Sequence, residues 1–110
     1  MGVILAPIVE GKLDAWKDWI GELNGPRKAE LGEFDRRYNL TKHSAWLAET
    51  PMGAFVVVIH EGPGAGEVMG KVGKSDHEFD KWFSGKVLEL HGMDVTKPPP
   101  GPLPELYLGS

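Results

Sequence analysis

The strongest alternation of hydrophobic and polar positions lies in the middle of the chain, in the stretch TKHSAWLAETPMGAFVVVIHE at 41–61. Its two halves are rich in β-branched and aromatic residues, and the Pro-Met-Gly turn between them predicts an antiparallel hairpin. If Glu49 pairs with Ala54, then His43 lies opposite His60, and the two imidazoles share one sheet face. The other face carries larger apolar side chains that we expect to pack under helices, namely Trp46, Ala48, Phe55, Val57 and Ile59.

The first third of the chain predicts one strand and two helices. Residues 3–9 form a nearly continuous apolar run, which is typical of a buried strand. Two helices are expected between Gly11 and Asn39, separated by a break at 24–26, with Asn39 as a left-handed C-terminal cap. Their apolar stripes are Leu13, Trp16, Ile20 and Leu23 in the first helix and Leu31, Phe34 and Tyr38 in the second.

After the hairpin, the pattern predicts two more helices. A loose glycine-rich loop at 62–66 leads to a short helix. Ser75 and Glu78 have capping-box spacing, so we expect Ser75 to cap an amphipathic helix that ends at Gly92. A proline-rich spacer follows at 97–102. The inward positions are Val68, Met69 and Val72 in the short helix and Phe79, Trp82, Phe83, Val87 and Leu90 in the long one.

The C-terminal segment LPELYL at 103–108 alternates and predicts a last, edge strand. The element order β-α-α-β-β-α-α-β then predicts one α+β domain over residues 1–110. Two β-α-β crossovers in one sheet give a ferredoxin-like β-α-β-β-α-β fold, with a four-stranded antiparallel sheet in the order 4-1-3-2. The uncovered sheet face would expose Leu47, Val56 and Val58. We therefore expect a homodimer that joins the two open faces into a dimeric α+β barrel.

Composition and charge narrow the functional classes. The chain is 41% hydrophobic and 25% charged, and its net charge of −4 with scattered basic residues argues against nucleic acid or an anionic membrane as a partner. There are no cysteines, which excludes disulfides, thiolate nucleophiles and cysteine-ligated metals. The N-terminus lacks the pattern of a signal peptide and no apolar run is long enough to span a bilayer, so we expect a cytoplasmic protein.

Several segments are similar to a known family. They are AWLAETP at 45–51, SDHEFDKWF at 75–83, HGMD at 91–94 and PEL at 104–106. Together they resemble an uncharacterised bacterial family of the dimeric α+β barrel superfamily, which includes antibiotic-biosynthesis monooxygenases, muconolactone isomerases and small polyketide cyclases. The resemblance implies the fold and the dimer. It implies function only by analogy with these relatives, because the family supplies no catalytic residues to transfer.

The paired histidines are the leading candidates for a site. At the same end of the predicted four-stranded sheet, Tyr107 and Glu105 would face His43 and His60. Two imidazoles, a phenol and a carboxylate in an apolar cavity can hold an enolisable or phenolic substrate and move a proton. We therefore expect an enzyme without an organic cofactor, isomerase-like or monooxygenase-like, with His60 as the base and His43 bonded to the substrate oxygen. The alternative is a dimeric domain that binds a small organic ligand without turnover.

Other polar groups have competing interpretations. His43, His60 and Glu105 would form a two-histidine, one-carboxylate metal set. However, the second and fourth strands would be the two sheet edges, about 14 Å apart, so a metal is disfavoured. His77 and Asp80 are three residues apart on a helix and can touch, although a helix N-terminus favours such acidic residues anyway. His91 near a helix C-terminus likewise suits the helix dipole.

The four tryptophans could form an aromatic box for a ligand or belong to the core. Trp16, Trp46 and Trp82 fall on stripes that also carry aliphatic or phenylalanine side chains, which favours the core. Trp19 lies off the main stripe of its helix. We expect it to face a partner or a loop.

Overall fold

The computed structural model describes residues 1–98 and 104–109 of the 110-residue chain. This part forms three strands and four helices in the order β-α-α-β-β-α-α. The strands are β1 (Gly2–Pro7), β2 (Lys42–Thr50) and β3 (Gly53–Glu61). The helices are α1 (Leu13–Asn24), α2 (Lys28–Arg37), α3 (Val68–Val72) and α4 (Glu78–His91). Within the described residues, no helix has the length and apolar character needed to cross a membrane.

The three strands form one antiparallel sheet with β3 in the centre, in the order β1-β3-β2. The register of the hairpin is confirmed, since Glu49 pairs with Ala54 and His43 with His60. On the other side of β3, strand β1 places Gly2 opposite His60. Partners in an antiparallel pair project to the same side, so the two histidines share one face of the sheet.

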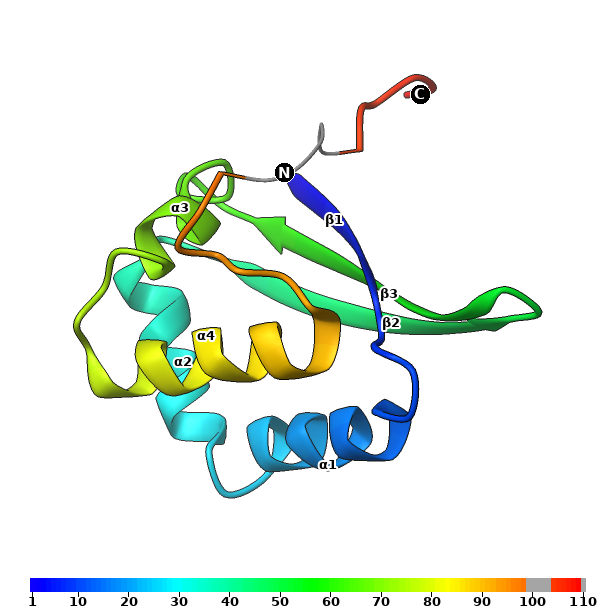
Figure 1. Cartoon of the computed structure of the whole chain (residues 1–110). Helices are drawn as coiled ribbons and strands as arrows, with labels where there is room; N and C mark the ends of the chain where they lie inside the picture. Colours follow the sequence, from blue (N-terminus) through cyan, green and yellow to red (C-terminus); the bar gives the residue numbers. More distant parts are fainter. Residues whose placement is uncertain (99–103, 110) are drawn as a thin grey trace.

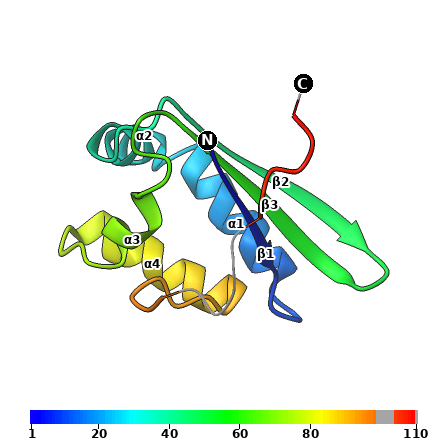
Figure 2. The ribbon, with the colours of Figure 1, turned by 90° about the horizontal axis from the view of Figure 1, so that it is seen from above.

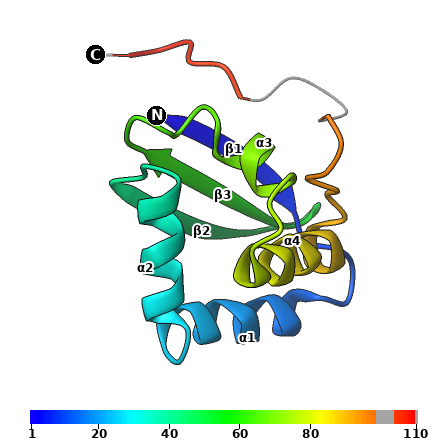
Figure 3. The same cartoon turned by 90° about the vertical axis from the view of Figure 1, so that its left-hand side faces the viewer.

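The helices pack against one face of this sheet, with α1 in contact with both α2 and α4 (Figures 1 and 3). Seen from above, β2 and β3 extend past the helical layer as a long hairpin (Figure 2). The core lies between the two layers. Its buried members are Trp16, Trp19, Leu23, Phe34, Leu40, Val56, Ala65, Val68, Val72, Phe79, Phe83, Val87 and Leu90.

The helices cover the opposite sheet face from the one predicted. Val56 and His60 are only 1% and 2% exposed, whereas Trp46 is 64% exposed and Leu5 is 55% exposed. Both faces are apolar, so alternation alone could not assign them. Packing against helices from other parts of the chain decides which face is covered, and the hairpin sequence does not contain that information. The prediction that Trp46 belongs to the core was therefore wrong.

The four-stranded ferredoxin-like sheet was also wrong. The described sheet has three strands, and residues 104–109 lie in an extended segment outside it, beyond the body of the molecule in Figure 1. Leu106 and Leu108 are 78% and 88% exposed, so alternation in this short segment did not reflect a buried face. Leu103, with which the predicted strand begins, and most of the proline-rich spacer lie outside the described residues.

The ends of the helices follow local sequence signals, except that α4 begins two residues later than predicted. Gly92 ends α4, as predicted, and has the left-handed conformation; Asn39 after α2 has φ 55°, which confirms the predicted left-handed cap. The N-cap of α4 is His77, whose Nδ1 accepts from the backbone N–H of Phe79, rather than Ser75. Ser75 lies two residues before this cap, and its hydroxyl oxygen accepts a hydrogen bond from the backbone N–H of His77.

The glycine-rich loop after β3 is packed rather than loose. Gly64 is buried, and a Cβ atom placed there would lie only 1.8 Å from the Tyr38 carbonyl oxygen. The Gly64 N–H donates to the carbonyl of Asn39. This close backbone approach joins the loop to the connection between α2 and β2, which is the segment that leads into His43.

Candidate functional site

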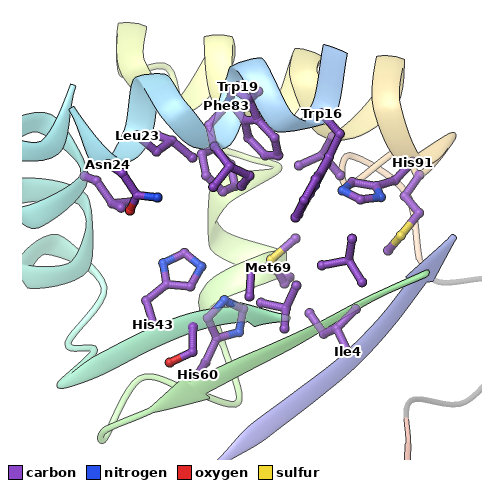
Figure 4. Close-up of a pocket in the computed structure, with 18 residues that line it drawn as sticks. Ile4, Trp16, Trp19, Leu23, Asn24, His43, His60, Met69, Phe83 and His91 are labelled. Carbon is purple, nitrogen blue, oxygen red and sulfur yellow. The ribbon is translucent and has the colours of Figure 1, made fainter. Parts of the chain in front are cut away.

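A cavity of about 170 Å³ lies between the sheet and the helices (Figure 4). Strands β2 and β3 supply its floor, where His43 and His60 project toward the helices. Trp16 and Trp19 from α1 and Phe83 from α4 supply much of its apolar wall. Among the residues that the structure describes, its lining contains histidine, serine and asparagine but no lysine, arginine, aspartate or glutamate. The cavity therefore suits an uncharged ligand with an apolar body.

His43 and His60 are in contact at one end of the cavity. Their ring centroids are 4.6 Å apart, with the rings tilted by 54°. The side chain of His43 is 12% exposed, and its ring lies 6.1 Å from the ring of Phe34 in a stacked arrangement. The sequence thus predicted this pair correctly, although it placed the pair on the uncovered face.

Asp35 orients His43, which the sequence analysis missed. The Oδ1 atom of Asp35, in α2, lies 3.0 Å from Nδ1 of His43. Because a carboxylate can only accept, the hydrogen is assigned to Nδ1, and Nε2 is then the nitrogen with a lone pair for a ligand. Asp35 is only eight residues before His43 across one tight connection. This short separation was the one sequence signal that could have predicted the contact. The spacing of residues along the predicted helix gave no reason to choose Asp35 over the other carboxylates.

His60 is neutral at physiological pH. Burial and, to a smaller extent, the nearby His43 lower the pKa of this histidine from 6.5 to about 4, while Asp35 opposes the shift. An imidazole with so low a pKa is a weak base at pH 7. It can still donate or accept a hydrogen bond in the cavity. His60 therefore fits a role in holding a ligand better than a role in accepting its proton.

A third histidine lies at the other end of the cavity. His91, at the end of α4, is 7% exposed, and its Nδ1 lies 2.8 Å from the carbonyl oxygen of Pro7, to which it donates. Burial lowers the pKa of His91, and this hydrogen bond only partly offsets the effect. The residue ties α4 to the end of β1. Its position is thus set by tertiary packing rather than by the helix dipole alone.

Tyr107 and Glu105 do not join the histidines. Tyr107 is 92% exposed and Glu105 is exposed, both in the extended C-terminal segment, and neither lines the cavity. The two-histidine, one-carboxylate metal set thus lacks its carboxylate. Across residues 1–98 and 104–109, no three histidine, aspartate or glutamate side chains gather in a group that could hold a metal.

The predicted contact between His77 and Asp80 is replaced by a buried polar cluster. Asp80 is fully buried, and it accepts hydrogen bonds from Arg37, Tyr38 and Ser75. Burial alone would raise the pKa of Asp80, but the three hydrogen bonds and the charge of Arg37 outweigh it and lower the pKa. The cluster fastens α4 to the end of α2. Two of its members, Arg37 and Tyr38, follow closely after Asp35 in the sequence. The cluster therefore helps to hold the helix from which Asp35 orients His43.

Comparison of the chain with protein-family models, with curated proteins and with solved structures finds no match.

Proposed function

We propose that this protein is a small-molecule enzyme that works without an organic cofactor and transfers a proton on an enolisable or phenolic substrate held in the cavity. The observation that supports the proposal is the pairing of Asp35 with His43 at the wall of an apolar cavity. His60 was the base expected from the sequence, but its low pKa favours His43 in that role. His60 would bond the substrate oxygen instead.

The proposed step is a simple acid–base exchange. His43 takes a proton through Nε2 from the carbon beside a carbonyl group, or from a phenolic hydroxyl, and the electron pair moves onto the substrate oxygen. Asp35 stabilises the imidazolium that forms, because its carboxylate bonds the other ring nitrogen. Returning the proton to a different carbon would complete an isomerisation. Attack of the carbanion on dioxygen and protonation would instead give a hydroperoxide on that carbon. Loss of water from the hydroperoxide, with cleavage of its O–O bond and of the remaining C–H bond, would leave a new carbonyl group, so that the substrate itself supplies the electrons of this monooxygenase-like reaction.

The size of the cavity sets the size of the substrate. A cavity of about 150 Å³ in another protein is known to accommodate one benzene molecule. The 170 Å³ here therefore fits a single six-membered ring with a small oxygen substituent.

Proton transfer can be tested without knowing the natural substrate. In deuterated buffer at neutral pD, the protein is expected to accelerate exchange of the α-protons of cyclohexanone and similar one-ring ketones, as measured by proton NMR. The rate should exceed that with the same concentration of free imidazole, and an oxygen electrode would detect any accompanying dioxygen consumption. Binding of these ketones with exchange no faster than imidazole would contradict catalysis. It would support the alternative of a binding module without turnover.

We also propose that the protein forms a homodimer through the open sheet face. This face presents a cross-strand row of Leu5, Val57 and Trp46, in which Leu5 and Trp46 are more than half exposed. Apolar side chains that are adjacent across strands and open to water are typical of an interaction surface. Because a sheet face is self-complementary under a two-fold axis, a second copy of the chain is the simplest partner.

Sedimentation velocity is expected to give twice the chain mass of 12.1 kDa for the wild-type protein. The double variant Leu5→Glu/Trp46→Glu should sediment as a folded monomer, because it places charges in the interface. Leu88→Glu is the matched control, since Leu88 is 51% exposed but lies on α4. A wild-type protein that remains monomeric at high micromolar concentration would refute the dimer.

A further inference from the structure

We propose that the side-chain amide of Asn24 binds a second oxygen of the substrate at the mouth of the cavity, so that the substrate is a ring with two neutral oxygen substituents. This inference names the substrate class of the site and rests on the proposed function. Asn24 is the last residue of α1 and lines the cavity. Its amide points from the end of α1 into the cavity, on the side where His43 lies (Figure 4).

The cavity opens to solvent beside Asn24. Among the lining residues that the structure describes, only Asn24 and Ala45 are exposed, and the others are buried or half-buried. Ala45 lies on β2, two residues after His43. The opening therefore runs between the end of α1 and β2, near the paired histidines. A ligand that enters here passes Asn24 before it reaches His43.

Asn24 is the polar side chain of this opening, since Ala45 supplies only a methyl group. Ser44 also borders the cavity, but it follows His43 along β2, and successive residues of a strand project to opposite faces. The hydroxyl of Ser44 therefore lies on the open sheet face, on the same side as Trp46. Besides the histidines, a ligand at the mouth thus meets the amide of Asn24.

The turn after α1 holds Asn24 in place. The backbone N–H of Arg27 donates to the carbonyl oxygen of Glu22, with 2.8 Å between the two atoms, and so closes the chain around Asn24. The guanidinium of Arg27 also lies 4.1 Å from the centre of the Trp82 ring, in α4. This cation–π contact fastens the corner between α1 and α2 to α4. A side chain on a fixed corner loses less conformational freedom when a ligand binds.

The amide determines which second substituent fits. It has two N–H donors and a carbonyl acceptor, so it can bind either a carbonyl or a hydroxyl group. A carboxylate would find no lysine or arginine in the described lining. A second oxygen at the mouth also stays close to water, so it costs little to desolvate. With His60 on the first oxygen and Asn24 on the second, the ring cannot turn, and the group that loses its proton stays oriented toward His43.

Isothermal titration calorimetry under nitrogen tests this assignment with phenol and the three benzenediols. At least one diol is expected to bind the wild-type protein more tightly than phenol, and the preferred isomer reports the spacing of the two oxygens. Asn24→Leu replaces the amide with an apolar group of nearly the same size. It should lower the ratio of diol affinity to phenol affinity by about fivefold, the usual effect of losing one neutral hydrogen bond. Asp18→Leu, at an exposed position of α1 outside the lining, is the matched control and should leave the ratio unchanged.

A second measurement observes the amide directly in the wild-type protein. Asn24 and Asn39 are the only side-chain carboxamides in the sequence, so their proton–nitrogen correlation signals are assigned by the pair that Asn24→Leu removes. The diol should shift the Asn24 signals more than phenol does. Asn39 lies outside the lining, and its signals should not move. An affinity ratio that is equal in the wild-type protein and Asn24→Leu, an unmoved Asn24 signal or failure of all four ligands to bind would overturn the inference.

These outcomes are distinguishable from failure of the proposed function. Ketone exchange without a preference for any diol removes only the role of Asn24. A diol preference that depends on Asn24, without ketone exchange, removes only the catalysis.

Discussion

Replacing His43 with glutamine is expected to reduce protein-dependent exchange of ketone α-protons by about 10²- to 10⁴-fold, the usual contribution of a positioned general base. Glutamine has a similar reach and can still form hydrogen bonds, but it cannot accept a proton at neutral pH. Asp35→Asn should cause a smaller loss. The amide keeps an acceptor near Nδ1 but no longer carries the charge that stabilises the imidazolium.

The controls separate a base from a structural histidine. His77→Gln changes an exposed histidine at the start of α4 and should leave the exchange rate unchanged. His60→Gln is expected to weaken ketone binding more than it slows exchange at saturation, because His60 holds the substrate oxygen. Loss of exchange in His60→Gln, together with full activity in His43→Gln, would reverse the two roles. Tyr107→Phe should have no effect, since Tyr107 is outside the cavity.

Replacing Asp80 with alanine should lower the free energy of unfolding by about 3 kcal/mol, the lower end of the range for breaking a buried ion pair. The lower end applies because the Arg37 side chain is 30% exposed and can turn to solvent, while Tyr38 and Ser75 lose a partner. The midpoint of thermal unfolding should fall by roughly 10–20 °C. Asp76→Ala, at an exposed neighbouring position, is the matched control and should change the midpoint of thermal unfolding little.

The stabilisation by Asp80 also depends on pH. The pKa of Asp80 is lower in the folded protein than its ordinary value of 3.8, so the folded state binds fewer protons than the unfolded chain in acid. The contribution of Asp80 to the free energy of unfolding is therefore complete above pH 3.8. It is lost as the pH falls through the pKa that Asp80 has in the folded protein. Urea unfolding of Asp80→Asn should lack this acid-dependent part. An unfolding free energy equal to that of the wild-type protein would show that the cluster contributes little.

The sequence was informative where neighbouring residues determine the structure. The turn at 51–53 and the alternation on either side of it set the hairpin register, so the pairing of His43 with His60 could be predicted. The left-handed cap at Asn39 and the helix end at Gly92 were predictable for the same reason. In each case, the physical cause is local backbone geometry.

The sequence was less informative where packing between distant segments determines which residues are buried. Both sheet faces are apolar, and only the packed structure shows that Val56 rather than Trp46 is covered by the helices. Trp19 was expected outside the core because it lies off one stripe, but α1 also packs against α4, where Trp19 contacts Phe83 and His91. The prediction of a C-terminal strand was wrong for a related reason. An alternating segment forms a strand only where it can pair with the edge of a sheet.

The placement of the helices has a consequence for a dimer formed through the open sheet face. In such an assembly the two sheets would stack back to back, and each cavity would lie on the far side of its own sheet, facing outward. Each cavity lies between a sheet and the helices of the same chain, away from the open face, so neither subunit would lend a residue to its partner. The two sites would then bind ligand independently, with a Hill coefficient of about one. Dissociation of the dimer would change stability and solubility while leaving the chemistry of each subunit intact.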